Sequence, residues 1–311
     1  MIKLKITIPT YNRPEFIRRQ VRDLLPQLRD GVSLIVYDNY SDIPVESLFN
    51  SGELEHFIIV RNKFNIGGAA NIGKCLSENG ESGWIWLLGD DDKIAPNAVE
   101  TILETIKNNQ DCCYINFQQK KTVKTENLYD FLAYMRIMGA FGVSFFQSAC
   151  LFNMDKLQNS VMYYYEYMSS WVGQIAMVIK YLDINRTEKC LFTTQKIITG
   201  ANVGGWSHLE IIINSSILLE KFRYLKPIMK TTLFKAIPDM DYTLLSQAES
   251  PIKVKLRYCS FIISRFGLFN VIKNNYISFA QFLLSVILPK RLFQSFRKKV
   301  AIRYNKKVNN E

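Results

Sequence analysis

The sequence predicts an α/β fold in which a mostly parallel sheet is flanked by helices, with a helical extension at the C-terminus. Over the first 117 residues, short apolar or β-branched runs alternate with segments of helical spacing, a pattern that favours a parallel sheet covered on both faces. From residue 211 onward the chain reads as successive amphipathic helices interrupted by prolines. A length of 311 residues is enough for one large α/β domain with an appendage.

The spacing of apolar residues sets the expected elements. Pro14 is placed to begin the first helix. Ligands of parallel α/β sheets bind beyond the carboxyl ends of the strands, so the loops after the strands are candidate sites. The strands are expected at residues 4–9, 33–38, 56–60, 84–88 and 112–117, and the helices between them at 14–28, 68–77 and 96–107. Beyond residue 120 we expect a helix near 129–138, a strand at 149–153 and a helix near 165–181.

The formal net charge of +11 is concentrated at one end of the chain. Residues 250–311 hold 13 Lys and Arg and one acid, Glu311, which leaves 26 basic and 27 acidic residues in the first 249. The six cysteines form no CxxC pair and show no regular spacing, which favours free thiols in a reducing compartment over a zinc site or a disulfide framework. The N-terminus lacks the apolar run of a secretory signal, so we expect a cytoplasmic protein.

Three adjacent carboxylates, Asp90, Asp91 and Asp92, follow the expected strand at 84–88. Like charges at the end of a buried strand repel one another unless solvent or a cation compensates them. Carboxylate oxygens suit Mg²⁺ or Mn²⁺, which keep coordination positions for diphosphate oxygens. The alternative is a solvated turn that precedes the next helix.

Polar residues also follow the other expected strands. Residues 9–13 read Pro-Thr-Tyr-Asn-Arg, a tight loop that can wrap a base and ribose while Arg13 faces phosphate. Asp38 closes the second strand, where it can accept a hydrogen bond from a uracil-type imide or simply form a turn. Residues 65–71 read Asn-Ile-Gly-Gly-Ala-Ala-Asn, and glycines at a helix start can admit an anion or merely make a turn.

The order and spacing of these four elements resemble the family 2 glycosyltransferases with the GT-A fold, over roughly residues 2–105. That family opens with a strand and a P-T-Y-N-R loop, continues to a strand ending in V-D-N-x-S-x-D, and later shows N-x-G before an L-D-D-D element. Here residues 36–42 read Val-Tyr-Asp-Asn-Tyr-Ser-Asp and residues 88–92 read Leu-Gly-Asp-Asp-Asp. Tyr37 before Asp38, and Ala70 where many members carry a phosphate-side Arg, depart from the pattern.

The resemblance implies a Rossmann-like GT-A catalytic domain at residues 1–210, with a donor-nucleotide half at 1–117 and an acceptor half at 118–210. It implies transfer of a sugar from a nucleoside diphosphate sugar, with UDP the first nucleotide to test, to a saccharide or lipid-linked saccharide acceptor in bacterial cell-surface polysaccharide synthesis, such as O-antigen or capsule. It also implies Mn²⁺ or Mg²⁺ as cofactor, with Asp92 and Asp90 as ligands. The implied donor-binding residues are Pro9, Thr10, Tyr11, Asn12, Arg13, Asp38, Asn39, Asn65, Gly67, Asn71, Asp90 and Asp91.

Further candidates come from the second half of the chain. Many inverting members place an acidic pair before a helix to deprotonate the acceptor hydroxyl. Residues 166–174 lack that pair, which leaves Glu166 as candidate base or as an ordinary surface acid; inversion is expected from family frequency alone. The glycine-rich segment at 199–208 carries Trp206, which can stack on the donor sugar, and His208, which is either a further metal ligand or an ordinary loop histidine.

The basic region at residues 211–311 predicts contact with an anionic membrane surface. Residues 276–289 are apolar but too few to span a bilayer, and cations follow at Lys290, Arg291 and 297–299. The alternative is a helical subdomain with a solvated basic face. No nucleic-acid-binding motif accompanies the charge, so nucleic acid is not an expected partner. We therefore expect a peripheral protein on the cytoplasmic face of the inner membrane.

Two other functions remain open from the sequence. A nucleotidyltransferase can share the sheet and the acidic cluster, but it usually begins with a glycine-rich phosphate loop, and residues 8–14 contain no glycine. A noncatalytic, nucleotide-sugar-binding membrane adaptor would explain the missing acidic pair.

Overall fold

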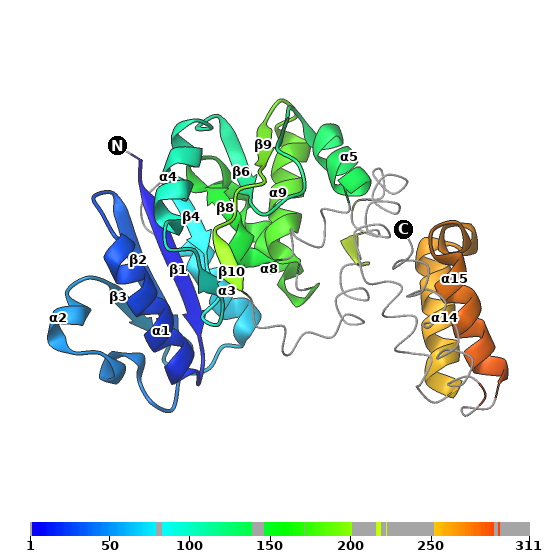
Figure 1. The fold of residues 1–311 in the computed structure, drawn as a ribbon, viewed down its shortest axis with the longest axis horizontal. Coiled ribbons are helices and arrows are strands. Elements are labelled where there is room, and N and C mark those ends of the chain that lie inside the picture. The colour runs from blue at the N-terminus through cyan, green and yellow to red at the C-terminus, as the bar shows by residue number, and fades with distance from the viewer. Residues whose placement is uncertain are drawn as a thin grey trace, which may run out of the picture.

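The centre of the molecule is an eight-stranded sheet in the order β3-β2-β1-β4-β8-β6-β9-β7 (Figure 1). The computed structural model describes residues 2–78, 83–138, 146–170, 172–200, 216–218, 222, 252–288 and 292. The strands of this sheet are β1 (Leu4–Thr10), β2 (Val32–Asp38), β3 (Ile58–Arg61), β4 (Trp84–Leu87), β6 (Cys112–Asn116), β7 (Val123–Thr125), β8 (Cys150–Asn153) and β9 (Lys189–Phe192). All of them run in one direction except β7 and β8, so the expectation of a mostly parallel sheet is confirmed.

Helices cover both faces of the sheet, because its central strands are buried on both faces. In β2, Leu34 and Val36 pack with α1 and α4, whereas Ile35 and Tyr37 pack with α3 and the helices of the second half. The helices of the sheet domain are α1 (Pro14–Leu24), α2 (Ser51–Leu54), α3 (Gly68–Ser77), α4 (Ala98–Lys107), α5 (Leu128–Met138), α7 (Met154–Leu157), α8 (Val161–Tyr167) and α9 (Gly173–Ile184).

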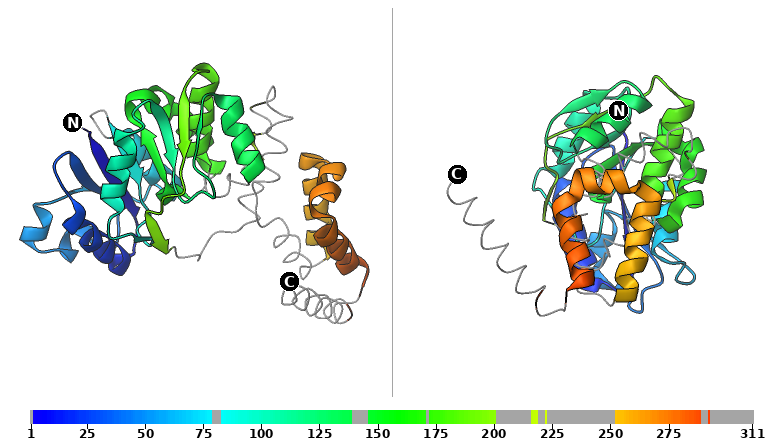
Figure 2. Two further views of the ribbon diagram at one scale, coloured as in Figure 1. Left: turned by 45° about the horizontal axis from the view of Figure 1, so that its top comes forward. Right: turned by 90° about the vertical axis from the view of Figure 1, so that its right-hand side faces the viewer.

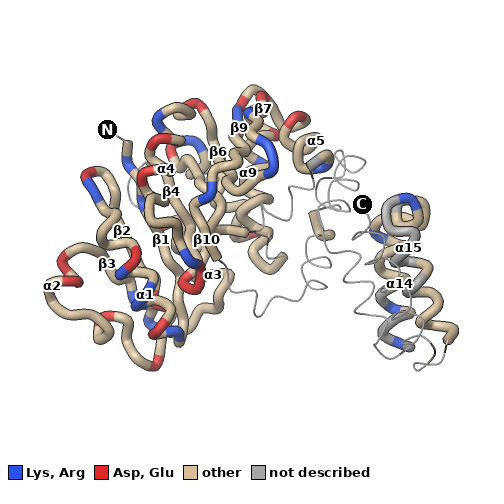
Figure 3. Tube along the Cα trace, in the orientation of Figure 1, with Lys and Arg blue, Asp and Glu red and all other residues tan. Residues whose placement is uncertain are grey.

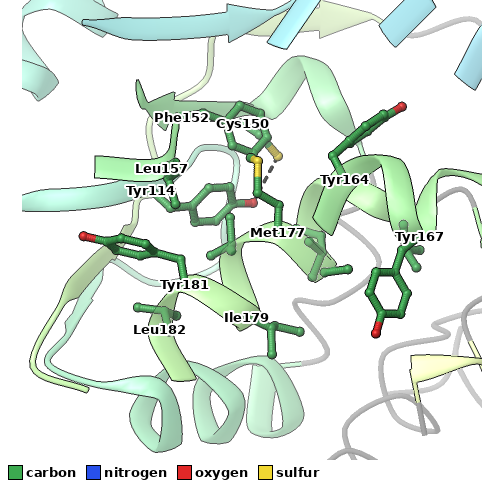
Figure 4. Close-up of a cluster of buried hydrophobic side chains, with 14 of the residues drawn as sticks. Tyr114, Cys150, Phe152, Leu157, Tyr164, Tyr167, Met177, Ile179, Tyr181 and Leu182 are labelled. Carbon is green, nitrogen blue, oxygen red and sulfur yellow. Dashed lines mark hydrogen bonds between the residues drawn. The ribbon is translucent and has the colours of Figure 1, made fainter. Parts of the chain in front are cut away.

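The second face holds a large core built around α9. Figure 4 shows Tyr114 of β6 directed at Cys150 of β8, with Met177 of α9 beside them and Leu182 of α9 further along the helix, near Tyr181. The Tyr114 hydroxyl lies 3.1 Å from the Cys150 sulfur, and all four side chains are buried. Because β8 lies beyond residue 117 and pairs with both β4 and β6, residues 1–117 and the residues that follow them share one sheet and one core.

Several details differ from the sequence-based expectation, among them the strands β7 and β9, which were not expected. The first helix ends at Leu24 and continues as a 3-10 turn, Leu25–Gln27, because Pro26 cannot donate the helical hydrogen bond. The single helix expected near 165–181 is two helices, α8 and α9, separated by a 3-10 turn at Met168–Ser170. A short antiparallel pair, β5 (Lys93–Ile94) and β10 (Ile198–Gly200), was not foreseen.

Gly173 is what lets α9 begin so close to α8. A Cβ on Gly173 would lie 2.8 Å from the backbone carbonyl oxygen of Tyr164, which cannot move without shifting α8. We expect Gly173→Ala to lower the free energy of unfolding by about 1–3 kcal/mol, as overpacking does. Gly68→Ala is the matched control, because its Cβ would meet nothing within 4 Å. Urea unfolding of both variants measures the difference; equal stability would contradict the close packing of α8 on α9.

The C-terminal helices are α14 (Ile252–Phe266) and α15 (Leu268–Ile287), joined at Gly267. They form an antiparallel pair that the left view of Figure 2 shows beside the sheet domain. Their bounds lie just inside Pro251 and Pro289, two of the four prolines expected to interrupt the helices; the other two, Pro227 and Pro238, lie outside the described residues. In the part of the chain that the structure describes, neither these helices nor any other is long and apolar enough to cross a bilayer. The rest of region 211–250 lies outside the described residues, apart from residues 216–218 and 222.

Candidate active site

The polar loops predicted to form a site do meet at one edge of the sheet. β1, β2 and β4 run parallel and are adjacent, so Thr10, Asp38 and the residues after Leu87 emerge side by side. The backbone N–H of Asn39 donates to the carbonyl oxygen of Thr10 at 2.9 Å, which joins the first two loops directly.

The acidic cluster is held by donors from the first loop. Thr10 Oγ1 donates to Asp90 Oδ2 at 2.7 Å. One guanidinium nitrogen of Arg13 donates to Asp90 Oδ1 at 3.0 Å and to Asp91 Oδ2 at 3.1 Å. Burial raises the pKa of Asp90, and the Thr10 and Arg13 contacts oppose that rise. Arg13 is thus the internal cation that compensates two neighbouring carboxylates.

In this cluster the pKa of Asp92 is raised the most. Its side chain is 5% exposed, and burial raises its pKa to about 6, with further increases from Asp91 and Asp90. Ser148, just before β8, donates to Asp92 Oδ2 and accepts the backbone N–H of Gly89 at 2.8 Å. Since Ser148 lies beyond residue 117, both the donor-nucleotide segment (residues 1–117) and the segment after it position this carboxylate.

Asp38 is completely buried and turned towards its own loop. Its Oδ1 accepts the backbone N–H of Ser41 at 2.8 Å, and its Oδ2 pairs with the guanidinium of Arg61 at the end of β3. Arg61 also donates to the carbonyl oxygen of Ser41 at 2.8 Å and lies over the ring of Tyr40. Tyr40 has a φ of 69°, a conformation that disfavours side chains, so these contacts hold a strained turn in place.

Asparagine side chains connect the second loop to the start of α3. Asn39 donates to Asn65 at 2.7 Å and accepts from Asn62 at 2.9 Å. Asn62 also donates to Asn71 at 2.9 Å, and Asn71 donates to the carbonyl oxygen of Tyr37 at 2.9 Å. The predicted residues Asn39, Asn65 and Asn71 therefore belong to one hydrogen-bonded network, in which Asn39 and Asn71 are buried and Asn65 is exposed. Gly67, with a φ of 86°, precedes the first turn of α3, a conformation that suits glycine.

An open pocket of about 200 Å³ lies between the first and second loops. Ile43, Val45 and Leu48 give it an apolar wall, and Asn12 with Asp42 gives it a polar rim. Asn12 donates to the Asp42 carboxylate at 3.0 Å and accepts the backbone N–H of Asp42 at 2.7 Å. A flat ring with a polar edge suits such a pocket, since apolar walls with a few fixed polar groups are typical of small-molecule sites.

The sequence matches the model of a known protein family. Residues 5–160, half of the chain, match the family described as Glycosyl transferase family 2. The chain belongs to this family, and it is a glycosyltransferase. No curated protein matches the sequence.

Solved structures resemble this glycosyltransferase in fold. TarS residues 1–349 from S. aureus have a TM-score of 0.57 at 12% identity, with 88% of this chain and 91% of that chain covered. The mannosyltransferase PcManGT from Pyrobaculum calidifontis, in complex with GDP-Man and Mn²⁺, has a TM-score of 0.51 at 14% identity, with 92% and 85% covered. At these identities the likeness shows the fold alone, which is GT-A, as the sequence predicted.

A divalent cation is implied for the glycosyltransferase, and the residues present fit one. Asp90 and Asp92 offer hard oxygen donors. Within the described residues no three Asp, Glu, His or Cys side chains already surround one point, but Mg²⁺-type sites often use one or two carboxylates and take phosphate and water as the other ligands. The raised pKa of Asp92 arises from burial and neighbouring carboxylates, both of which a cation would offset.

Other predicted residues lie elsewhere or outside the described chain. Pro9 and Tyr11 flank Thr10, and the Tyr11 ring is exposed. Glu166 is exposed on α8 next to the buried Tyr167. Trp206 and His208 fall in residues 201–215, outside the described ranges; β10 ends just before them, paired with β5, which begins directly after Asp92.

Sequence reasoning missed two residues that shape the site. Arg61 could have been found, because it ends the third parallel strand as Asp38 ends the second. Ser148 gave no such signal, since it precedes a strand and reaches Asp92 across 56 positions of sequence.

Proposed function

We propose that this glycosyltransferase binds a nucleoside diphosphate sugar at the carboxyl edge of β1, β2 and β4 and transfers the sugar to a saccharide or lipid-linked saccharide. The observation that carries the proposal is the buried carboxylate pair Asp90 and Asp92 beside a ring-sized pocket. The pocket suits the base, and the carboxylates suit a cation on the diphosphate. The related structures of TarS with UDP-GlcNAc and of PcManGT with GDP-Man and Mn²⁺ support it.

In this proposal the first loop, residues 9–13, contacts both the base and the diphosphate of the nucleotide. Asn12 and the apolar wall of the pocket hold the base, with UDP the first nucleotide to test. Asp38 supports the base indirectly, because Arg61 and the Ser41 N–H occupy its oxygens; a direct contact would have to displace one of these donors. Asn39, Asn65, Gly67 and Asn71 fix the start of α3 near the donor.

The cation is Mn²⁺ or Mg²⁺, held by Asp92 and Asp90. When bound, it supplies charge neutralisation for the diphosphate leaving group. With a cation bound beside Asp90 and Asp91, the half-exposed guanidinium of Arg13, which pairs with both carboxylates here, would be free to donate to a phosphate oxygen. Ser148 keeps Asp92 oriented.

The reaction inverts configuration in this proposal, with a carboxylate accepting the proton of the acceptor hydroxyl. Glu166 is the candidate base from the sequence, and its exposed position on α8 means that an acceptor would have to approach α8 from solvent. Trp206 and His208, on the segment after β10, are the further candidates for the donor sugar and the metal.

We place the activity at the cytoplasmic face of the inner membrane, in synthesis of a cell-surface polysaccharide. Residues 1–210 form the catalytic domain, and residues 211–311, which carry most of the excess positive charge, provide peripheral attachment. Attachment of this kind gives access to a lipid-linked acceptor without a spanning helix.

The products of turnover test the proposal. We expect release of nucleoside diphosphate from a UDP-, dTDP-, GDP- or CDP-sugar in the presence of Mn²⁺. Release of pyrophosphate from a nucleoside triphosphate instead would identify a nucleotidyltransferase. Tight donor binding with no turnover across a panel of saccharide and lipid-linked acceptors would favour the adaptor.

A further inference from the structure

One side of α15 carries exposed apolar residues near both of its ends. Phe269, Ile272, Ala280, Leu283 and Ile287 are all exposed, and their spacing of 3, 8, 3 and 4 positions puts them on one side of a helix with 3.6 residues per turn. Val271 and Ser285, on the opposite side, are buried. We name these five residues the α15 stripe. It runs for about 27 Å along the helix, at 1.5 Å per residue.

The α15 stripe differs from the other exposed apolar residues of the described chain. Ile137 and Ile184 are 71% and 65% exposed, but they end separate helices of the sheet domain. Single apolar residues of this kind are ordinary on protein surfaces. Phe269 and Ile287 are each 76% exposed and mark the two ends of an aligned set, which indicates a surface that meets a partner.

The charge around the α15 stripe identifies the chemistry of that partner. Residues 250–310 contain no acid and 13 cations, and Figure 3 shows Lys and Arg but no Asp or Glu on α14 and α15. Lys273 lies next to the stripe, with its ammonium 5.9 Å from the centre of the Phe269 ring. Lys253 and Arg257 are exposed on α14. Apolar side chains accompanied by cations alone suit an anionic lipid surface.

We propose that the α15 stripe is the surface that enters an anionic bilayer, with α15 lying in the plane of the interface. The inference rests on the peripheral attachment proposed above and names the residues that make it. Phe269 and Ile287 anchor the two ends of the helix among the acyl chains, and Lys273 pairs with lipid phosphate beside Phe269. A helix of 20 residues with one such face lies on a membrane and does not cross it.

Flotation of the full chain with vesicles tests the proposal. We expect the wild type to float with phosphatidylcholine vesicles that contain about 30% phosphatidylglycerol, at about 0.15 M salt, and to float less with phosphatidylcholine alone. Phe269→Ser combined with Ile287→Ser should lower the partition coefficient at least tenfold. Transfer of each apolar side chain from water into the bilayer is expected to favour binding by more than tenfold, and the variant loses both. Ile137→Ser with Ile184→Ser is the matched control and should float as the wild type does.

Two further measurements separate the outcomes. Phe269→Trp should show blue-shifted fluorescence that brominated lipid quenches; unchanged fluorescence with vesicles would overturn insertion. Flotation of the stripe variant at the wild-type level would overturn it too. If the stripe instead contacts a second copy of the chain, Phe269→Ser with Ile287→Ser will change the mass of the protein assembly in solution. If the stripe contacts another part of this chain, the Tm of the same variant without vesicles will fall. UDP binding measured on the same variants should stay unchanged, which keeps failure of membrane docking distinct from failure of the donor site.

Discussion

Asp92→Asn is expected to make the metal-free protein more stable while removing its activity. Asp92 has a pKa raised to about 6, chiefly by burial, so the folded state holds this proton more tightly than the unfolded chain. Its contribution to stability is therefore full below the unfolded pKa near 4 and is lost as pH rises through about 6. At pH 7.5 the ionised carboxylate costs on the order of 3 kcal/mol, and a neutral amide avoids that cost.

Thermal unfolding without metal measures this effect. At pH 7.5 we expect Asp92→Asn to raise Tm by several degrees, since about 1 kcal/mol shifts Tm by roughly 2–4 °C in a domain of this size. At pH 5 about half of the gain should remain, because the folded carboxyl is then protonated while the unfolded one is still ionised, and at about pH 3 the gain should disappear. Asp91→Asn, at a more exposed position, is the control and should shift Tm little at either pH. A Tm of Asp92→Asn at or below that of the wild type at pH 7.5 would contradict the account.

The loss of activity in Asp92→Asn follows from the same carboxylate. An amide is a weaker ligand for a divalent cation and leaves the leaving-group charge less compensated. With several kcal/mol of transition-state stabilisation at stake, turnover should fall by about 10²–10³-fold. Added Mn²⁺ should raise the Tm of the wild type and leave that of the variant unchanged. The most stable form of the site is thus not the active one.

Arg61→Met is expected to be among the most destabilising single changes in the donor half. It leaves Asp38, which is fully buried, without its cation, and breaking a buried pair from one side costs about 3–5 kcal/mol. It also removes the donor to the Ser41 carbonyl oxygen and the contact with Tyr40. The second loop should loosen, and nucleotide affinity should fall with it because Ser41 and Asp42 line the pocket.

Denaturant unfolding at pH 7.5 gives the measurement for Arg61→Met. Arg22→Met is the control, because Arg22 pairs with Glu53 at 2.9 Å while more than half exposed, and such pairs contribute about 0–1 kcal/mol. Combining Arg61→Met with Asp38→Asn should restore part of the stability by removing the uncompensated charge. Equal losses of unfolding free energy in Arg61→Met and Arg22→Met would show that the buried Arg61–Asp38 pair stabilises the protein no more than an exposed pair does.

The sequence predicted the edge of the sheet well and the contacts on it poorly. Strand ends follow from local apolar runs, and parallel strands place their carboxyl ends together, so Thr10, Asp38 and Asp90 were correctly expected to meet. Which group each carboxylate faces depends on distant chain. Asp38 could be read as a base contact because its partner, Arg61, lies 23 positions away on the next strand.

Residues 118–200 were harder to predict, because their packing depends on close contacts between segments that are distant in the sequence. The apolar residues around positions 165–181 fit one helix, but a 3-10 turn at Met168–Ser170 separates α8 from α9, and α9 begins at Gly173, where a Cβ would lie 2.8 Å from the Tyr164 carbonyl oxygen. Ser148 shows the same limit, since a lone serine before a strand carries no mark of its contact with Asp92. Local patterns specify elements, whereas these contacts are decided by the packing of one half on the other.

Calorimetric titration with UDP, dTDP, GDP and CDP, with and without Mn²⁺, is the decisive measurement for the proposed donor and metal site. We expect at least one of these nucleotides, UDP first, to bind the wild type in a Mn²⁺-dependent manner. Asp92→Asn should lose this dependence while remaining folded and more stable. If a folded wild-type protein binds none of the four nucleotides, or if Asp92→Asn binds them with unchanged dependence on Mn²⁺, the assignment of the donor and metal site is contradicted.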